Sequence, residues 1–124
     1  MVKEENIANH AGYVNEKSIG IEHVNTYSHN KRGKRLKPTR EQYNASARLV
    51  AHLCLKYDIP VIHCTSCNEK GIAGHTEIDG KTKHGECVDP AWDWDTYIKK
   101  VQHMAMLIKL CGYEGSLQCI GSPK

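Results

Sequence analysis

The sequence predicts a single α/β domain in which a mixed β-sheet is flanked by α-helices. A chain of 124 residues has room for one compact domain. Side chains alternate in character along residues 17–22, which is typical of a strand, whereas apolar residues recur at helical spacing over residues 39–57 and again from residue 93. Strand and helix patterns that follow one another along a short chain favour an α/β arrangement.

The first expected strand, residues 17–22, carries a carboxylate on its polar face. Ile19 and Ile21 fall on one face of the strand, and Gly20 and Glu22 fall on the other. Glycine inside a strand often marks a place where a ligand approaches the backbone closely. Glu22 is therefore a candidate site residue on a half-buried strand.

The first expected helix begins after Thr39 and ends near Tyr57. Thr39 is its predicted N-cap, and Gln42, three residues on, completes a capping box. Pro60 sets the limit at the other end, because proline disfavours helical geometry in the residue before it. The β-branched segment 59–63 predicts a second strand. The apolar face of the helix carries Tyr43, Ala47, Val50, Cys54 and Tyr57.

A glycine-punctuated loop over residues 64–86 leads to a final amphipathic helix. Asp93 is the predicted N-cap of this helix, and Gly112 is predicted to end it. We expect the folded domain to cover residues 1–110 and a tail of uncertain order to occupy residues 111–124. The buried face of the final helix is expected to carry Tyr97, Ile98, Val101, Ala105 and Ile108.

The bulk composition excludes several classes of protein. With 40% hydrophobic residues, 25% charged residues and a net charge of +3, the chain has the composition of a globular protein and lacks an apolar run long enough for a membrane span. The basic segment 31–37 contains no aromatic residue, so we interpret it as a solvated loop and expect no nucleic-acid partner. The first residues lack the apolar run of a signal peptide, which predicts cytoplasmic synthesis, and the alternative is an extracellular location reached by another route.

Six cysteines leave several interpretations open. Cys64-x-x-Cys67 followed by His84-x-x-Cys87 has a spacing close to that of small structural zinc sites. A local disulfide or free thiols in a loop is the more economical interpretation of the same residues. The pairs close enough in sequence to be disulfide partners are Cys64 with Cys67 and Cys111 with Cys119.

One histidine and one aspartate form a second candidate metal site. His75 lies in a loop motif, and Asp89 follows fourteen positions later. An imidazole and a carboxylate are part of what a zinc ion with an open coordination position needs, although such a pair also occurs often by chance. Trp92 and Trp94 could stack on sugar rings, but at a helix start a role in the core is favoured. The histidines that show no partner pattern are His23, His29, His52, His63 and His103.

Five short motifs occur in order along the chain: Asn9-His10-Ala11-Gly12, Asn15-x-x-Ser18-Ile19-Gly20-Ile21-Glu22, Thr39-x-x-Gln42-Tyr43, Gly74-His75-Thr76-Glu77-Ile78, and Asp89-Pro90 with Trp92-Asp93-Trp94. Together they resemble the zinc-dependent N-acetylmuramoyl-L-alanine amidases. That family includes phage endolysins, bacterial wall-recycling amidases and, more distantly, animal peptidoglycan recognition proteins. The resemblance covers residues 2–101, and the ordered set is far more specific than any single motif.

The resemblance implies a role for three residues and a substrate. His75 and Asp89 are expected to be zinc ligands, and Glu22 is expected to be the acid/base residue near the metal-bound water. The implied substrate is the amide bond between N-acetylmuramic acid and L-alanine in bacterial peptidoglycan, cleaved by a zinc-activated water. Action at the cell wall is therefore expected. The residues expected to contact the substrate are His10, Asn15 and Trp92.

Two departures from the family pattern affect the metal site. In the family the first zinc ligand is a histidine on a strand that precedes the motif beginning at Asn9, and this chain starts after that point. Cys87 stands where many members have a lysine. His10 or Cys87 is the candidate for a further ligand. We therefore expect an N-terminally incomplete amidase domain, and the alternatives are a catalytically impaired peptidoglycan-binding module or a small structural-zinc interaction protein.

Overall fold

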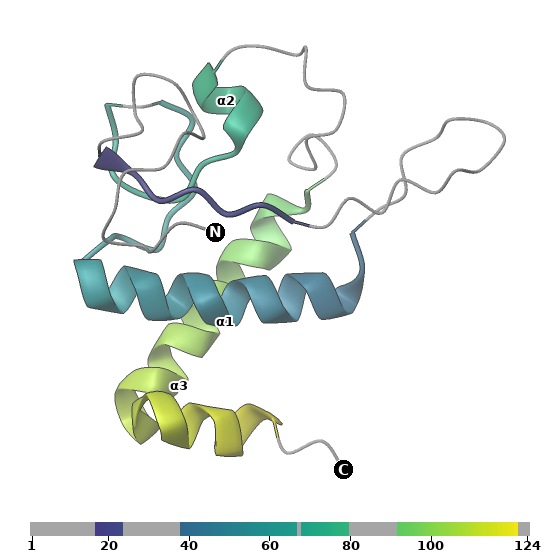
Figure 1. Ribbon diagram of the computed structural model, residues 1–124, viewed down its shortest axis with the longest axis vertical. Coiled ribbons are helices and arrows are strands. Elements are labelled where there is room, and N and C mark those ends of the chain that lie inside the picture. The colour runs from purple at the N-terminus through teal and green to yellow at the C-terminus, as the bar shows by residue number, and fades with distance from the viewer. Residues whose placement is uncertain (1–16, 24–37, 67, 80–91, 122–124) are drawn as a thin grey trace, which may run out of the picture.

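The computed structural model describes residues 17–23, 38–66, 68–79 and 92–121, the last nine by their backbone alone. Two long helices, α1 (Arg40–Tyr57) and α3 (Trp94–Gly121), pack against each other. The short helix α2 (His75–Asp79) belongs to the connection between them, so His75, predicted to lie in a loop, lies in a helix. Figure 1 shows α3 running across α1, and the extended segment 17–23 passing along α1 on the side where α2 lies.

The prediction of a mixed sheet flanked by helices is wrong. The described residues are mainly helical, and their β-structure is limited to an isolated parallel bridge between His63 and Ile72. The predicted strand over residues 59–63 is reduced to this bridge, in which Ile72 N–H donates to the carbonyl of Ile62 at 2.8 Å and Cys64 N–H donates to the carbonyl of Ile72 at 2.9 Å. Ile59 N–H donates to the carbonyl of Cys54 at 2.9 Å and Pro60 has no N–H, so neither residue donates to a ladder.

The predicted strand over residues 17–22 is extended chain that buries its inner face on helices. Ile21 is half-buried against the helical core, whereas Ile19, predicted to share that face, is 36% exposed. Glu22 is exposed, as expected for the opposite face. Alternation of side chains follows from extended backbone and needs no partner strand, which explains why the pattern was present without a sheet.

Helix α1 confirms the predicted bounds and N-cap, although Tyr57, predicted to lie on its apolar face, is 39% exposed. The Thr39 hydroxyl accepts from Gln42 N–H at 3.1 Å, and the Gln42 side chain accepts from Thr39 N–H at 2.9 Å, which completes the capping box. The helix ends at Tyr57, because Asp58 adopts a left-handed conformation with φ of 54° and returns its N–H to the carbonyl of Cys54. Aspartate tolerates this conformation better than most residues.

Helix α3 begins as predicted and extends further than predicted. Asp93 caps it, since one carboxylate oxygen accepts from Thr96 N–H at 3.2 Å and the other from the Thr96 hydroxyl at 2.8 Å. Gly112 breaks the helical geometry with φ of 76° and ψ of 165°, yet helix resumes beyond it to Gly121, where an irregular tail was expected. None of the helices in the described part of the chain combines the length and the apolar character that crossing a membrane requires.

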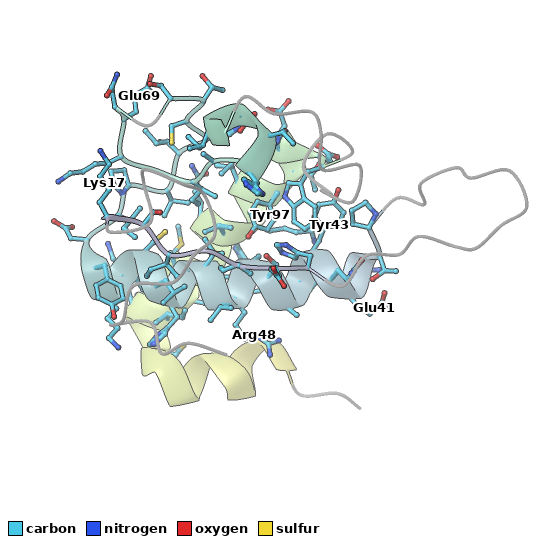
Figure 2. The ribbon with its side chains drawn as sticks, turned by 45° about the horizontal axis from the view of Figure 1, so that its top comes forward. Lys17, Glu41, Tyr43, Arg48, Glu69 and Tyr97 are labelled. Carbon is cyan, nitrogen blue, oxygen red and sulfur yellow. The ribbon has the colours of Figure 1, made fainter. Side chains whose placement is uncertain are left out.

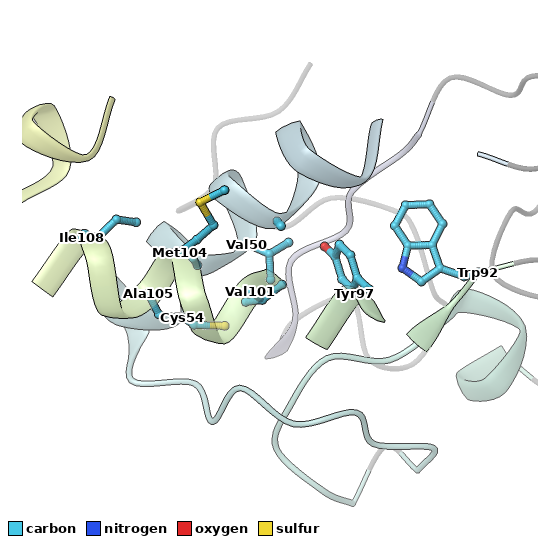
Figure 3. Packing of buried hydrophobic residues seen from close by; sticks show 10 residues of the cluster. Val50, Cys54, Trp92, Tyr97, Val101, Met104, Ala105 and Ile108 are labelled. Carbon is cyan, nitrogen blue, oxygen red and sulfur yellow. The ribbon is translucent and has the colours of Figure 1, made fainter. Parts of the chain in front are cut away.

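The core lies where α1 and α3 meet. Two alanines of α1, Ala47 and Ala51, are fully buried, and their small side chains allow α3 to approach closely at Val101, which is also fully buried. Figure 3 shows this packing and its continuation toward the start of α3, where Tyr97 and Trp92 close the core. Other buried members of the cluster are Val50, Cys54, Met104, Ala105 and Ile108.

Candidate functional site

Glu22 is held between two inward-facing neighbours. The side chains of Ile21 and His23 point to the helices, and the carboxylate of Glu22 between them is exposed to solvent. The ring of His23 lies 4.7 Å from the ring of Trp92, which precedes α3. The segment therefore presents one carboxylate outward from a backbone that is anchored on both sides.

A chain of hydrogen bonds links this segment to both long helices. His23 Nε2 lies 2.7 Å from the hydroxyl oxygen of Ser46 on α1, and that oxygen lies 2.7 Å from the hydroxyl of Tyr97 on α3. Ser46 is 6% exposed and Tyr97 is 2% exposed. Burial lowers the pKa of His23 below its usual value and raises the pKa of Tyr97 to about 12, against the opposing effect of its hydrogen bond to Ser46. Figure 2 shows Tyr97 and Tyr43 on the same side of α1.

The lowered pKa of His23 predicts that the folded chain loses stability in mild acid. The folded state binds fewer protons than the unfolded state as pH falls below 6.5, the usual pKa of histidine, so the free energy of unfolding decreases with falling pH in that range. Above that pH the contribution is fully present. We expect urea unfolding to show a steeper loss of stability between neutral pH and about pH 5 than in a His23→Gln variant. If the free energy of unfolding depended on pH equally in the two proteins, the result would contradict a lowered pKa of His23.

His75 is the first residue of α2 and is half-buried. The carboxylate of Glu77 holds the turn before it, since Glu77 Oε2 accepts from Gly74 N–H at 2.7 Å. This is one half of a capping box, in which the third residue of a helix reaches back to the N-cap backbone. Glu77 therefore fixes where α2 begins, and with it the position of His75.

Glu77 also ties α2 to the rest of the fold through His63. His63 Nε2 lies 2.9 and 3.0 Å from the two carboxylate oxygens of Glu77. The His63 ring stacks on the ring of Trp94 at 3.9 Å, with 5° between the planes. Gly71 lets the chain return close to His63, because a Cβ there would lie 2.8 Å from the carbonyl oxygen of Ile62. Helix α2 is thus linked to the first residue of α3.

The structure places some of the predicted site residues and leaves others outside the described residues. Glu22 and His75 lie on separate elements, and His10, Asn15, Cys87 and Asp89 lie outside the described part. Within residues 17–23, 38–66, 68–79 and 92–121, no group of three His, Cys, Asp or Glu side chains could hold a metal ion. Of the residues predicted to bind zinc in the amidase site, His75 is thus the one whose surroundings are described, and a complete site would need ligands from outside the described residues.

Trp92, predicted to contact substrate, is 8% exposed. Its ring centre lies 4.3 Å from that of Tyr43 and 5.0 Å from that of Tyr97, so neighbouring rings cover it. For a tryptophan at a helix start, a role in the core was expected more often than stacking on a sugar ring, and the burial of Trp92 agrees with the core role. Trp94 is half-buried and stacks on His63.

Cys64 is a buried free thiol, and its environment disfavours the thiolate. Burial raises the pKa of Cys64, and the carboxylates of Glu69 and Glu77 raise it further. Cys64 is also the first residue of the structural-zinc alternative, and zinc, when bound, would itself favour the thiolate. The other residues of that alternative, Cys67, His84 and Cys87, lie outside the described residues.

Sequence reasoning missed the structural partners of His23 and His63. His23 falls on the same face of the alternating segment as Ile21, so the alternation that placed Glu22 outward also placed His23 inward. No comparable sequence pattern indicates the partners of His63, because Glu77 and Trp94 are fourteen and thirty-one residues away in sequence.

Comparison with known proteins identifies the class to which these elements belong. A family model described as N-acetylmuramoyl-L-alanine amidase matches residues 1–92, about three quarters of the chain. The match spans the segment of Glu22, helix α1, helix α2 with His75, and the residue Trp92 at which the core closes. No curated protein and no solved structure matches the chain significantly. The chain belongs to the N-acetylmuramoyl-L-alanine amidase family, and this confirms the resemblance drawn from the five motifs.

Proposed function

We propose that this chain hydrolyses peptidoglycan at the amide bond that joins the lactyl group of N-acetylmuramic acid to L-alanine, with the help of a zinc ion. The observation that carries the proposal is the family match over residues 1–92, because Glu22, His75 and Asp89 all fall within it. These are the three residues to which the family motifs assign the acid/base and metal-binding roles.

The donor types available to the metal fit zinc. His75 offers an imidazole nitrogen and Asp89 a carboxylate oxygen, and Cys87 or His10 is the candidate for a further ligand. When bound, zinc lowers the pKa of a water from about 15.7 to about 7 and polarises a carbonyl group. The hydrogen bond that Glu77 accepts from Gly74 N–H and its hydrogen bond with His63 support His75 by holding the helix start that carries it.

Glu22 supplies the proton transfer in this proposal. Its carboxylate takes a proton as water adds to the scissile carbonyl and delivers a proton to the departing amine of L-alanine. Exposure of Glu22 suits a polymeric substrate, which approaches the protein from outside rather than entering a closed cavity. Anchoring by Ile21 and His23 supports a fixed position for this carboxylate.

The test is digestion of purified cell walls with the full chain, followed by measurement of new amino termini. We expect new N-terminal L-alanine, loss of this activity after chelation, and its return when zinc is added back. His75→Ala is expected to lower both activity and zinc content, whereas the matched control His103→Ala, at an exposed position of α3, is expected to change neither.

Three results would count against the proposal. Release of new reducing sugar ends in place of L-alanine termini would indicate glycosidic cleavage. Full activity in the chelated protein would exclude zinc. Binding to walls without any bond cleavage would favour the alternative of a peptidoglycan-binding module.

A further inference from the structure

Three buried or half-buried polar side chains from three different elements form one hydrogen-bonded chain that the proposed chemistry does not use. His23 comes from the extended segment, Ser46 from α1 and Tyr97 from α3, and both hydrogen bonds are 2.7 Å long. Polar groups placed in a core are costly unless they are hydrogen-bonded. Apolar side chains at these three positions would pack without needing hydrogen-bond partners. The hydrogen-bonded row of polar groups therefore needs an explanation other than packing.

The number of hydrogens fixes the direction of this chain. Ser46 has one hydroxyl hydrogen and lies between two partners, so it donates to one of them and accepts from the other. If Ser46 donated to Tyr97, the hydroxyl hydrogen of Tyr97, which is 2% exposed, would need a second acceptor, and the described residues provide none. Within the described residues, the arrangement that satisfies every group has Tyr97 donating to Ser46 and Ser46 donating to Nε2 of His23, which is then neutral. The lowered pKa of His23 agrees with this direction.

A Ser–His pair raises the question of nucleophilic catalysis, and burial answers it. Ser46 is 6% exposed, and its hydroxyl oxygen already lies 2.7 Å from both partners. A nucleophile must reach the substrate carbonyl, and Tyr97 and His23 occupy the positions around this oxygen. The pair is therefore a structural connection.

We propose that His23 is a positioning residue for Glu22, acting through Ser46 and Tyr97. This inference rests on the proposed role of Glu22 as the acid/base residue. The extended segment has no strand ladder within the described residues, so its backbone depends on side-chain anchors. His23 is the next residue after Glu22, and its hydrogen bond fixes the backbone from which the Glu22 carboxylate projects.

The tilted contact between the His23 and Trp92 rings supports the same conclusion. Trp92 covers one side of the imidazole at 4.7 Å, while Ser46 holds Nε2, so the ring is constrained by packing and by a hydrogen bond. Two independent constraints on one side chain leave little freedom to the peptide units beside it. A carboxylate that must transfer a proton benefits from a fixed backbone position, because a small displacement of the carboxylate lowers the reaction rate.

The experiment compares variants that break the chain at different points. Ser46→Ala and His23→Leu remove it, Tyr97→Phe removes its terminal donor, and His23→Gln retains an acceptor for Ser46 near the place of Nε2. Ala45→Ser is the matched control, because Ala45 is the exposed neighbour of Ser46 on the same helix and the substitution exchanges the same two residue types in reverse. For each variant, backbone amide exchange of residues 20–23 and the kinetic constants on purified peptidoglycan are measured.

We expect Ser46→Ala and His23→Leu to lower kcat about 10- to 100-fold with little change in KM. Amide exchange in residues 20–23 should become about tenfold faster or more, while protection in the core of α1 and α3 is kept. His23→Gln should restore most of both properties, and Ala45→Ser should leave both unchanged. A purely structural role would instead lower stability without the selective loss of kcat and without rescue by glutamine.

The two proposals can fail separately. If Ser46→Ala and His23→Leu keep the kcat of the unmodified chain while Glu22→Gln is inactive, the positioning role is wrong and the proposed function stands. If the unmodified chain releases no L-alanine termini, the proposed function fails, and exchange of residues 20–23 still decides whether His23 anchors the segment. Unchanged exchange in all variants would overturn the inference.

Discussion

Replacing Glu22 by glutamine is expected to lower kcat on peptidoglycan about 10²- to 10⁴-fold, the usual contribution of a positioned general acid or base. Glutamine keeps the size of the side chain and removes its ability to exchange a proton. Because Glu22 is exposed, the free energy of unfolding should change by less than about 0.5 kcal/mol. The measurement is the initial rate of appearance of L-alanine amino termini at saturating substrate.

The matched control for this prediction is Glu41→Gln. Glu41 is an exposed carboxylate in the first turn of α1, so it tests whether loss of one surface charge alone affects binding to the wall. We expect the Glu41 variant to retain its kcat. Equal activity of the Glu22 variant and the unmodified chain would remove Glu22 from the mechanism, and an increase in KM alone would assign it to substrate binding.

The two long helices, α1 and α3, could be predicted because their signals are local. Thr39 and Gln42 are three residues apart, and the capping box that they form depends on no distant contact. Asp93 and Thr96 stand in the same relation at the start of α3. The resumption of helix after Gly112 was missed, because a glycine with positive φ predicts an end of the helix and carries no information about the residues that follow.

The sheet was wrongly predicted because strand pairing is a non-local property. An alternating pattern predicts extended backbone with one buried face, and the half-burial of Ile21 and exposure of Glu22 agree with that much. It does not say whether the inner face meets another strand or a helix. In the described residues that face meets α1 and α3, through the apolar contact of Ile21 and the hydrogen bond between Ser46 and His23.

The candidate site could be predicted only as a set of motifs in order. The motif that contains His75 also contains Glu77, whose contact with Gly74 is local because the two residues are three positions apart. Its contact with His63 spans fourteen residues and depends on the return of the chain at Gly71 and on the approach of α3, both of which are tertiary features. The residues that support the site were therefore visible only in the structure.

Replacing Trp92 by alanine is expected to have the largest effect on stability, a loss of about 3 to 5 kcal/mol in the free energy of unfolding. Trp92 is 8% exposed and lies against Tyr43, Tyr97 and His23, so truncation leaves a cavity bordered by three rings. For a chain of this size the total stability is on the order of 5 to 15 kcal/mol, so the loss is a large fraction of it. Urea unfolding followed by far-ultraviolet circular dichroism measures it.

Trp92→Phe separates this core role from a role in substrate binding. Phenylalanine keeps an aromatic ring against Tyr43 and Tyr97, so the expected loss is only about 1 to 2 kcal/mol. If the core role governs, activity per folded molecule stays unchanged in this variant, because the covered ring does not reach the substrate. If instead KM for peptidoglycan rises while stability is kept, Trp92 contacts the substrate, and the packing seen around its ring must open during binding.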